Sequence, residues 1–242
     1  MTRRWHRPTL VAWMLAAFGV AFFSVLGIWQ LDRAAQKEQL FAAFAGAGSQ
    51  TPVALDEARR IAPGAGRYPL VSVRGRFDAA HGYVLDDQVR DGAVGSIAYA
   101  VFEPADGSTP LLVDRGFVAG RVRGERPAIP PLPEGDRQLL ALYAPPPGSG
   151  LRLGGNPLPR QKTWPKQSIY LDVGEVSADL GRTLDARILL LAPEQGSGFV
   201  REWRPDVFPP ERHRAYAFTW FTLASIVAGV FVGMHWRKES TQ

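Results

Sequence analysis

The side chains best suited to binding chemistry lie at one end of each of two long apolar segments. They are Gln30, Arg33 and Lys37 after the first segment, and His213, Tyr216 and Trp220 at the start of the second. On continuous helices, the spacings of three, four and seven residues would put each group on a single helix face. A histidine at such a position serves either as a ligand-binding group or as a polar cap. Each face is therefore a candidate surface for a ligand or a partner.

The same region has a simpler interpretation as a set of membrane-interface anchors. Tryptophan and tyrosine gather at membrane surfaces, and arginines reach lipid headgroups. This interpretation would account for Trp29, Tyr216, Trp220, Arg33, Arg212 and Arg214. Both interpretations stay open from the residues alone.

Two segments of the 242-residue chain are long and apolar enough to cross a membrane. Residues 10–31 and 216–236 contain no Asp, Glu, Lys or Arg, and each reaches the ~20 residues that a spanning helix needs. The first is longer than a signal-peptide core, and no Ala-x-Ala cleavage site follows it. We therefore predict two retained transmembrane helices over these residues.

Most of the formal net charge of +5 comes from the two tails, residues 1–9 and 237–242. Because basic residues flank membrane spans on the cytoplasmic side, both termini are expected in the cytoplasm. Residues 32–215 would then form a periplasmic domain of a protein in the bacterial inner membrane. A nucleic-acid-binding protein would carry its basic excess on the folded domain instead.

The large loop between the two segments has the pattern of a β-rich domain. Strong helix formers as far as Phe44 extend the first helix, and Gly46, Gly48 and Pro52 end it. Alternating apolar residues then predict strands over residues 68–77, 82–85, 96–102, 111–118, 138–143, 168–171 and 187–191, with a short helix at 174–180. The predicted fold class is a membrane α+β protein, in which two transmembrane helices bracket one antiparallel β-sheet that could curl into a barrel.

Catalytic and metal-binding motifs are absent from the sequence. There is no Cys, which excludes disulfides and thiolate metal sites. No phosphate-binding loop, nucleophile elbow or His-Glu-x-x-His motif occurs. An enzyme would have no recognisable catalytic group, and a transporter would lack charged residues within its spans.

Small residues predict how the two membrane helices pack. Ser225, Gly229 and Gly233 recur every four residues, which is a stripe suited to close helix contact. We expect this stripe to pack on the first helix at Ala12, Ala16 and Gly19. The face that carries His213 would then be free.

Four motifs, in order and between two spans, resemble the surfeit-locus family of cytochrome c oxidase assembly factors in its bacterial form. They are Gly27-x-Trp29-Gln30-Leu31-x-Arg33-x-x-x-Lys37, then Arg67-Tyr68 leading to Val71, Val73, Gly75 and Phe77, then Leu111–Val118, and last His213-x-x-Tyr216-Ala217-x-Thr219-Trp220-Phe221. The family usually has Asn and Trp where this chain has Asp114 and Phe117.

The resemblance implies a non-enzymatic assembly factor that binds haem a at the outer membrane surface and aids its insertion into oxidase subunit I. His213 would be a candidate iron ligand. Arg33, Arg212 and Arg214 would be candidate partners of the haem propionates. The remaining members of the implied cofactor-binding site are Tyr216, Trp220, Trp29 and Gln30. The implied partners are subunit I, the haem a synthesis machinery and membrane lipid. Two alternatives stay open: a haem-independent scaffold for subunit I, and a membrane-anchored periplasmic enzyme.

Arg115-Gly116, within the third motif, and Lys37, within the first, are the remaining candidates for partner contact or for structure. Arg115 could contact a partner or a propionate, or pair with an acid at a strand end. Gly116 would then mark a β-bulge that requires close backbone approach.

Overall fold

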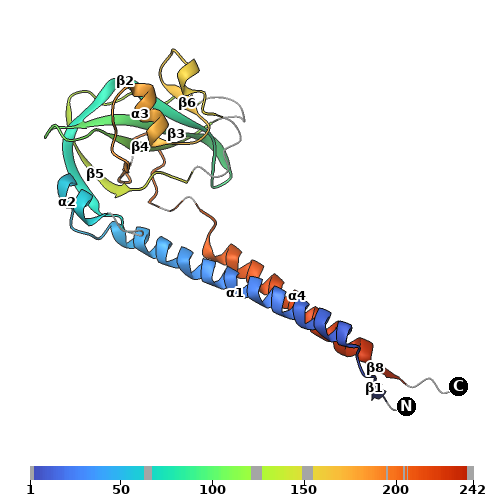
Figure 1. Ribbon diagram of the computed structural model, residues 1–242. Helices are drawn as coiled ribbons and strands as arrows, with labels where there is room; N and C mark the ends of the chain where they lie inside the picture. Colours follow the sequence, from blue (N-terminus) through green and yellow to red (C-terminus); the bar gives the residue numbers. More distant parts are fainter. Residues whose placement is uncertain are drawn as a thin grey trace. The chain divides into compact units, whose positions relative to one another are not determined.

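The computed structural model describes residues 3–62, 67–120, 127–148, 155–194, 196–203, 205 and 207–238 (Figure 1). Residues 1–2 and 239–242 of the predicted tails lie outside this set. The chain divides into two units, one made of Met1–Phe41 with Val207–Gln242 and the other of Ala42–Asp206. The first unit holds two long helices and the second holds a β-sheet.

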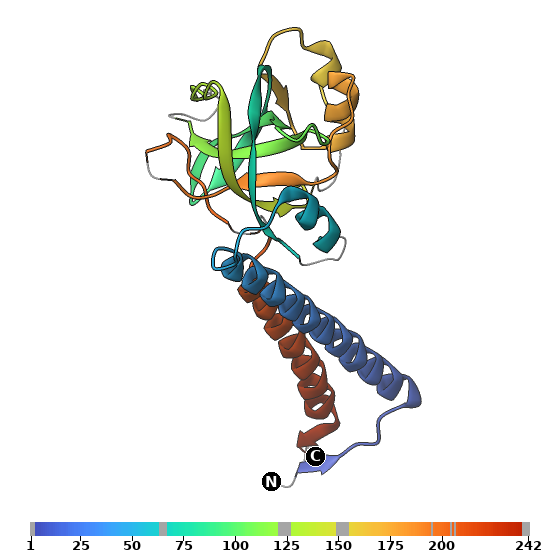
Figure 2. The ribbon, with the colours of Figure 1, turned by 90° about the vertical axis from the view of Figure 1, so that its left-hand side faces the viewer.

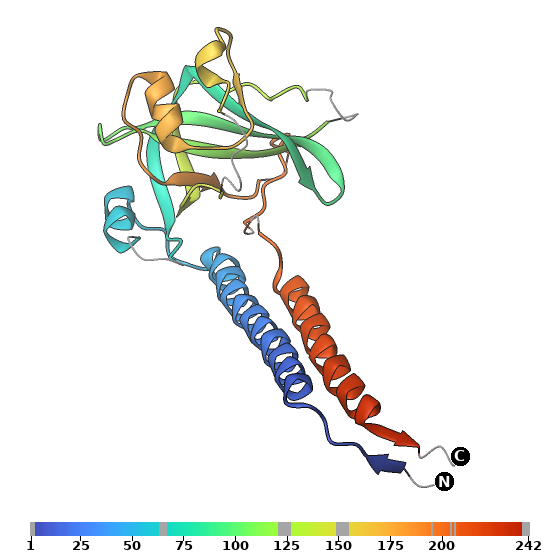
Figure 3. The ribbon, with the colours of Figure 1, turned by 45° about the vertical axis from the view of Figure 1, so that its right-hand side comes forward.

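The helical unit confirms the continuous first helix that the sequence predicts. Helix α1 spans Leu10–Ala47 and therefore continues beyond the apolar segment. Helix α4 spans Pro210–His235 and starts six residues before the predicted span, so that His213 lies on the helix. Proline suits the first turn of a helix because its missing N–H would have no partner there. The two helices run side by side (Figure 3).

The termini of the helical unit are joined by a short two-stranded ribbon. Strand β1, Arg3–Trp5, pairs antiparallel with β8, Trp236–Lys238. Because the ribbon ties the start of α1 to the end of α4, the helices are antiparallel.

Both helices are long and apolar enough to cross a membrane, and their apolar windows are only 6% and 11% buried within the protein. Exposed apolar surface of that extent is unfavourable in water. The helices are thus consistent with a membrane protein.

The second unit is built on a six-stranded sheet, seen most openly in Figure 2. Its strands are β2 Leu70–Arg90, β3 Ala93–Pro104, β4 Leu111–Ala119, β5 Asp136–Ala144, β6 Lys166–Ser168 and β7 Ile188–Leu191. The neighbours run in the order β3-β4-β7-β5-β2-β6, and β2 also pairs with β3, so five strands form a closed cycle of pairings. The predicted antiparallel arrangement holds except at β4–β7 and β2–β6, which are parallel.

Strand β2 joins two segments that the sequence predicts as separate strands. Its first part pairs with β5 and its second part with β3, and a register shift separates Phe77 from Gly82. Asp91 and Gly92 connect β2 to β3 with φ values of 49° and 81°. Two consecutive positive φ values define a tight hairpin turn whose twist matches that of the strands.

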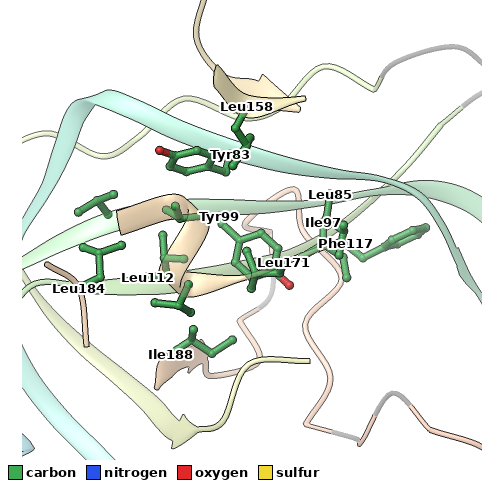
Figure 4. Close-up of a cluster of buried hydrophobic side chains, with 13 residues drawn as sticks. Tyr83, Leu85, Ile97, Tyr99, Leu112, Phe117, Leu158, Leu171, Leu184 and Ile188 are labelled. Atoms are coloured by element: carbon green, nitrogen blue, oxygen red, sulfur yellow. The ribbon is translucent and has the colours of Figure 1, made fainter. Parts of the chain in front are cut away.

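Apolar side chains fill both faces of this sheet. One cluster surrounds Tyr83, Tyr99 and Leu112 and is covered by α3, Val173–Leu180, which was predicted (Figure 4). The 3₁₀ turn at Leu158–Arg160 adds Leu158 to it. The other cluster is covered by α2, Leu55–Ile61, which the sequence analysis did not predict. Because both faces are buried, β3 reads as a nearly continuous apolar run rather than a strict alternation.

Strand β4 contains a bulge at Arg115. Ala98 faces Gly116 and Tyr99 faces Asp114, so that Arg115 has no partner across the strand pair. Gly116 has a φ of 117°, and a Cβ there would lie 2.8 Å from Phe199 Cβ and 2.9 Å from the Val200 carbonyl oxygen. The predicted bulge is therefore confirmed, and the glycine is needed for the close approach of the 199–201 segment.

We expect Gly116→Ala to destabilise the sheet domain by about 3 kcal/mol or more, because the backbone conformation and the close contacts both oppose a Cβ. Gly107→Ala is the matched control: its φ is 73°, but a Cβ there would meet nothing within 4 Å, so only the conformational cost of about 1–2 kcal/mol applies. Urea unfolding of the detergent-solubilised protein measures both. Equal losses of unfolding free energy in the two variants would show that the close contacts around Gly116 do not contribute to the destabilisation.

Candidate functional site

The two long helices, α1 and α4, pack along a continuous seam. Its α4 residues recur at alternating intervals of three and four and are more buried than the residues around them: His213, Ala217, Trp220, Ala224, Val227 and Phe231. Among the partly or fully buried residues of α1, one set also recurs at intervals of three or four: Ala12, Ala16, Gly19, Phe23, Gly27, Gln30 and Ala34. This spacing is that of left-handed helix packing.

Small residues of α1 let the helices approach closely. A Cβ built at Gly27 would lie 2.7 Å from the Phe221 ring. A Cβ at Gly19 would lie 3.2 Å from a methyl group of Val227 and 4.0 Å from its Cβ. Gly19 and Gly27 of α1 therefore receive the larger side chains of α4.

The predicted packing of the α4 glycine stripe is wrong. Ser225, Gly229 and Gly233 are exposed, and a Cβ at either glycine would meet nothing within 4 Å. The prediction identified small residues correctly on α1 but assigned the wrong face of α4. The face that carries His213 packs on α1 because the glycines of α1 leave room for its larger side chains.

His213 is held by Gln30 of α1, with a distance of 2.8 Å between Nδ1 and Oε1. An amide oxygen can only accept a hydrogen bond, so Nδ1 is the donor, and in the neutral imidazole Nε2 is then the nitrogen that carries the lone pair. Nε2 is buried and has no hydrogen-bond partner in the described part of the chain. The sequence placed these two residues on separate candidate faces, and the structure brings them together.

Trp220 lies on the same face of α4, two turns beyond His213. Its ring stacks on Phe23 of α1, with centroids 5.8 Å apart and planes at 17°. Its Nε1–H is buried and finds no acceptor among the described residues, where His213 Nε2 has no hydrogen-bond partner either. A buried indole N–H normally has a hydrogen-bond partner. The seam therefore holds an unpartnered donor, the Trp220 N–H, and, in the neutral imidazole, an unpartnered acceptor, His213 Nε2.

The third predicted member of this face, Tyr216, lies outside the seam. It is 57% exposed, and Trp29 of α1 is 51% exposed. These two aromatic residues fit the interpretation as membrane-interface anchors.

The predicted cations differ in their partners and in their exposure. Arg214 forms an ion pair with Glu38 of α1, a partner that the sequence analysis missed. The guanidinium of Arg212 lies 5.0 Å from the centre of the Phe208 ring. Arg33 is exposed and donates to Gln36 of its own helix, whereas Lys37 is partly buried near the seam.

Arg115 and Gly116 belong to the sheet unit. Nη2 of Arg115 donates to the Pro130 and Pro131 carbonyls at 2.8 and 2.7 Å, and the guanidinium stacks over Phe199. The predicted partner acid is therefore replaced by two backbone oxygens, which fasten the 127–133 segment to the bulge.

The neighbouring Asp114 is a partly buried residue whose carboxylate accepts a hydrogen bond from the Gly116 N–H. Burial raises its pKa to about 6, although Arg90, the Gly116 N–H and Arg201 favour the ionised form. The described residues contain no group of three or more His, Asp or Glu that could hold a metal ion.

The fold and the seam define a class of protein: two apolar helices flank a sheet domain, and a paired histidine lies between the helices. A family model described as the SURF1 family matches residues 17–225, which is more than half of the chain. The chain belongs to the SURF1 family, whose members are in general cytochrome oxidase assembly factors rather than catalysts. No curated protein matches it.

The chain has no cysteine, so the seam can be tested by introduced pairs. We expect Gly19→Cys with Val227→Cys to form a disulfide on mild oxidation, because the Cβ–Cβ separation of 4.0 Å lies within the range of about 3.5–4.5 Å for disulfides. Gly19→Cys with Gly229→Cys is the control and should stay reduced. Mobility in non-reducing gels measures both, and a disulfide only in the control pair would restore the original packing prediction.

We expect Asp114→Asn to stabilise the sheet domain at pH 7 by up to about 3 kcal/mol. The pKa of this carboxyl is about 6 in the folded state and 3.8 as an isolated group. Its protonation therefore stabilises the folded protein below pH 4, and this contribution is lost as the pH rises through 6. The amide retains the acceptor for Gly116.

Urea unfolding of both proteins between pH 4 and pH 8 checks this. The stability difference should be smallest at pH 4 and largest above pH 6. A constant difference across that range would contradict the shifted pKa.

Proposed function

We propose that the protein binds haem a through His213 and aids the insertion of haem a into subunit I of cytochrome c oxidase. The observation that carries this proposal is the hydrogen bond between His213 Nδ1 and Gln30. In the neutral imidazole, the lone pair is then on Nε2, which is buried in the helix seam without a hydrogen-bond partner. Neutral imidazole is a standard axial ligand of haem iron. An unpartnered buried nitrogen thus fits the group that the family implies.

Gln30 prepares His213 for this role. Histidines that ligate metals usually donate their other ring N–H to an acceptor, which fixes the tautomer and the orientation of the ring. The Gln30 amide oxygen is such an acceptor at 2.8 Å. When bound, haem a would supply the redox-active iron that the oxidase requires.

Access to His213 requires the seam to open. Nε2 and the Trp220 N–H are both sealed by protein atoms. Because α4 meets α1 at glycines and alanines near this point, a small separation of the helices would expose both groups. Trp220 would then offer one hydrogen-bond donor two turns along α4 from the imidazole, and a single imidazole ligand would favour release as well as binding.

Arginines near the seam would neutralise the propionates. Arg33 and Arg212 are exposed and have no carboxylate partner within the described residues. Arg214 would have to leave Glu38, so it is the less suitable of the three. Trp29 and Tyr216 would anchor the helices at the membrane surface beside them.

The proposed setting is the bacterial inner membrane, with both termini in the cytoplasm and the sheet domain in the periplasm. The basic tails support this orientation. The closed cycle of strand pairings supports a barrel-like domain. Subunit I, the haem a synthesis machinery and lipid are the proposed partners.

A haem-independent scaffold for subunit I is the second candidate function. It is favoured by the burial of His213 Nε2, since a purely structural histidine would also be enclosed. Retention of oxidase assembly by a variant that cannot bind haem would select this alternative.

We expect His213→Ala to lose at least nine-tenths of the haem a that co-purifies from cells that synthesise it. Gln30→Leu should weaken binding about 10- to 100-fold, as the loss of other outer-shell partners does. His235→Ala is the control, because that histidine lies at the other end of α4 and bonds to the Phe231 carbonyl. Visible spectra of the purified proteins provide the measurement, and an unchanged His213→Ala spectrum would refute the proposal.

A further inference from the structure

The sheet unit contains a cavity of about 220 Å³ that the haem proposal does not use. Small residues of β2 and β3, among them Gly82, Ala98 and Ala100, line it. Pro130–Pro131 and Trp164–Pro165 line it as well, together with Arg115 of β4. Tyr83 and Tyr99 also line it, and the Arg115 guanidinium is the only charged group among its described lining residues.

Arg115 has unused hydrogen-bonding capacity. The residue is only 7% exposed. Nη2 donates to two proline carbonyls, and the other nitrogens, Nη1 and Nε, have no hydrogen-bond partner among the described residues. Because a guanidinium carries five N–H donors, three remain available.

The charge of Arg115 is not balanced by a carboxylate in the described residues. Its charged neighbour is Arg201, which is itself paired with Glu194. Burial and the charge of Arg201 lower the pKa of Arg115 to about 10. A buried cation without a counter-ion is unfavourable, so an anion placed against it would be stabilised by its charge.

We propose that this cavity binds a carboxylate on a short apolar stem, with the free N–H groups of Arg115 as its anchor. Charge-assisted hydrogen bonds would fix the carboxylate, and the alanine, proline and tryptophan surfaces would receive the stem. The volume suits a group of the size of one side chain rather than a large ligand. The carboxylate belongs either to a small free acid or to an acidic side chain of a partner protein.

Titration of the full-length protein in detergent with sodium pentanoate, followed by calorimetry and by the Arg Nε–Hε NMR signals, tests the proposal. Pentanamide is the matched neutral probe. We expect pentanoate to bind at millimolar concentrations and to shift the Arg115 signal, and pentanamide to bind at least tenfold more weakly. Equal binding of the two probes would overturn the proposal.

Two variants localise the binding without removing the arginine that holds the fold. Ala80 is exposed and lines the cavity, so Ala80→Leu should obstruct it and weaken pentanoate binding at least tenfold. Ala93→Leu introduces the same side chain at an exposed position of β3 that does not line the cavity, and binding should be unchanged. Unchanged affinity in Ala80→Leu would place the ligand elsewhere and refute the proposal.

A capped Ala-Glu-Ala peptide, compared with capped Ala-Gln-Ala, distinguishes the two sources of the carboxylate. Tighter binding of the Glu peptide than of pentanoate would assign the cavity to an acidic side chain of a partner. Tighter binding of pentanoate would assign it to a free acid. Failure of both carboxylates to bind at millimolar concentrations would overturn the proposal.

Discussion

The close contact between α1 and α4 is the constraint on which the helical unit depends. In a membrane, lipid is as apolar as the helices, so association depends on packing and on interhelical hydrogen bonds. The glycines at 19 and 27 provide the packing by admitting Val227 and Phe221. The bond between His213 and Gln30 adds a polar contact that fixes the rotation of one helix relative to the other. The same contact that stabilises the pair therefore also orients the candidate ligand.

The sheet unit follows a comparable logic at the β4 bulge. The extra residue, Arg115, turns its guanidinium toward the 127–133 segment, and Gly116 allows the 199–201 segment to approach from the other side. Two irregular segments are thus fastened to one point of a regular strand. The Pro130 and Pro131 carbonyls that accept from Arg115 are neutral. The positive charge of Arg115 is therefore not balanced by them, and part of its hydrogen-bonding capacity stays unused.

Local patterns in the sequence were enough to predict the helices and most strands. Composition predicted the extension of α1 to the region of Phe44. The parallel pairing of β7 with β4 was not predictable, because it joins segments about 75 residues apart. The two parts of β2 looked separate because Asp78–His81 interrupts the alternation. Helix α2 is too short for its periodicity to be recognised.

The candidate site was only partly predictable for a related physical reason. The sequence identified His213, Trp220 and Gln30 as site residues. The face of α4 that contacts α1 was predicted from small residues in α4, and that criterion selected the wrong face. Helix pairs need small residues on only one side of a contact, and here α1 supplies most of them, while Phe221 and Val227 of α4 fill the space. The alternating three- and four-residue spacing from His213 to Phe231 was the signal that would have found the seam.

The two departures from the family pattern have local explanations in the sheet unit. An Asp at position 114 offers the same Oδ1 acceptor to the Gly116 N–H that an Asn would offer. Phe117 is 2% exposed, and its ring lies directly over Gly95, where a Cβ would come within 2.7 Å of it. The guanidinium of Arg90 lies 6.0 Å from the centre of the ring. Since both side chains are engaged within the domain, their substitution alters internal packing and charge and does not remove an exposed contact surface.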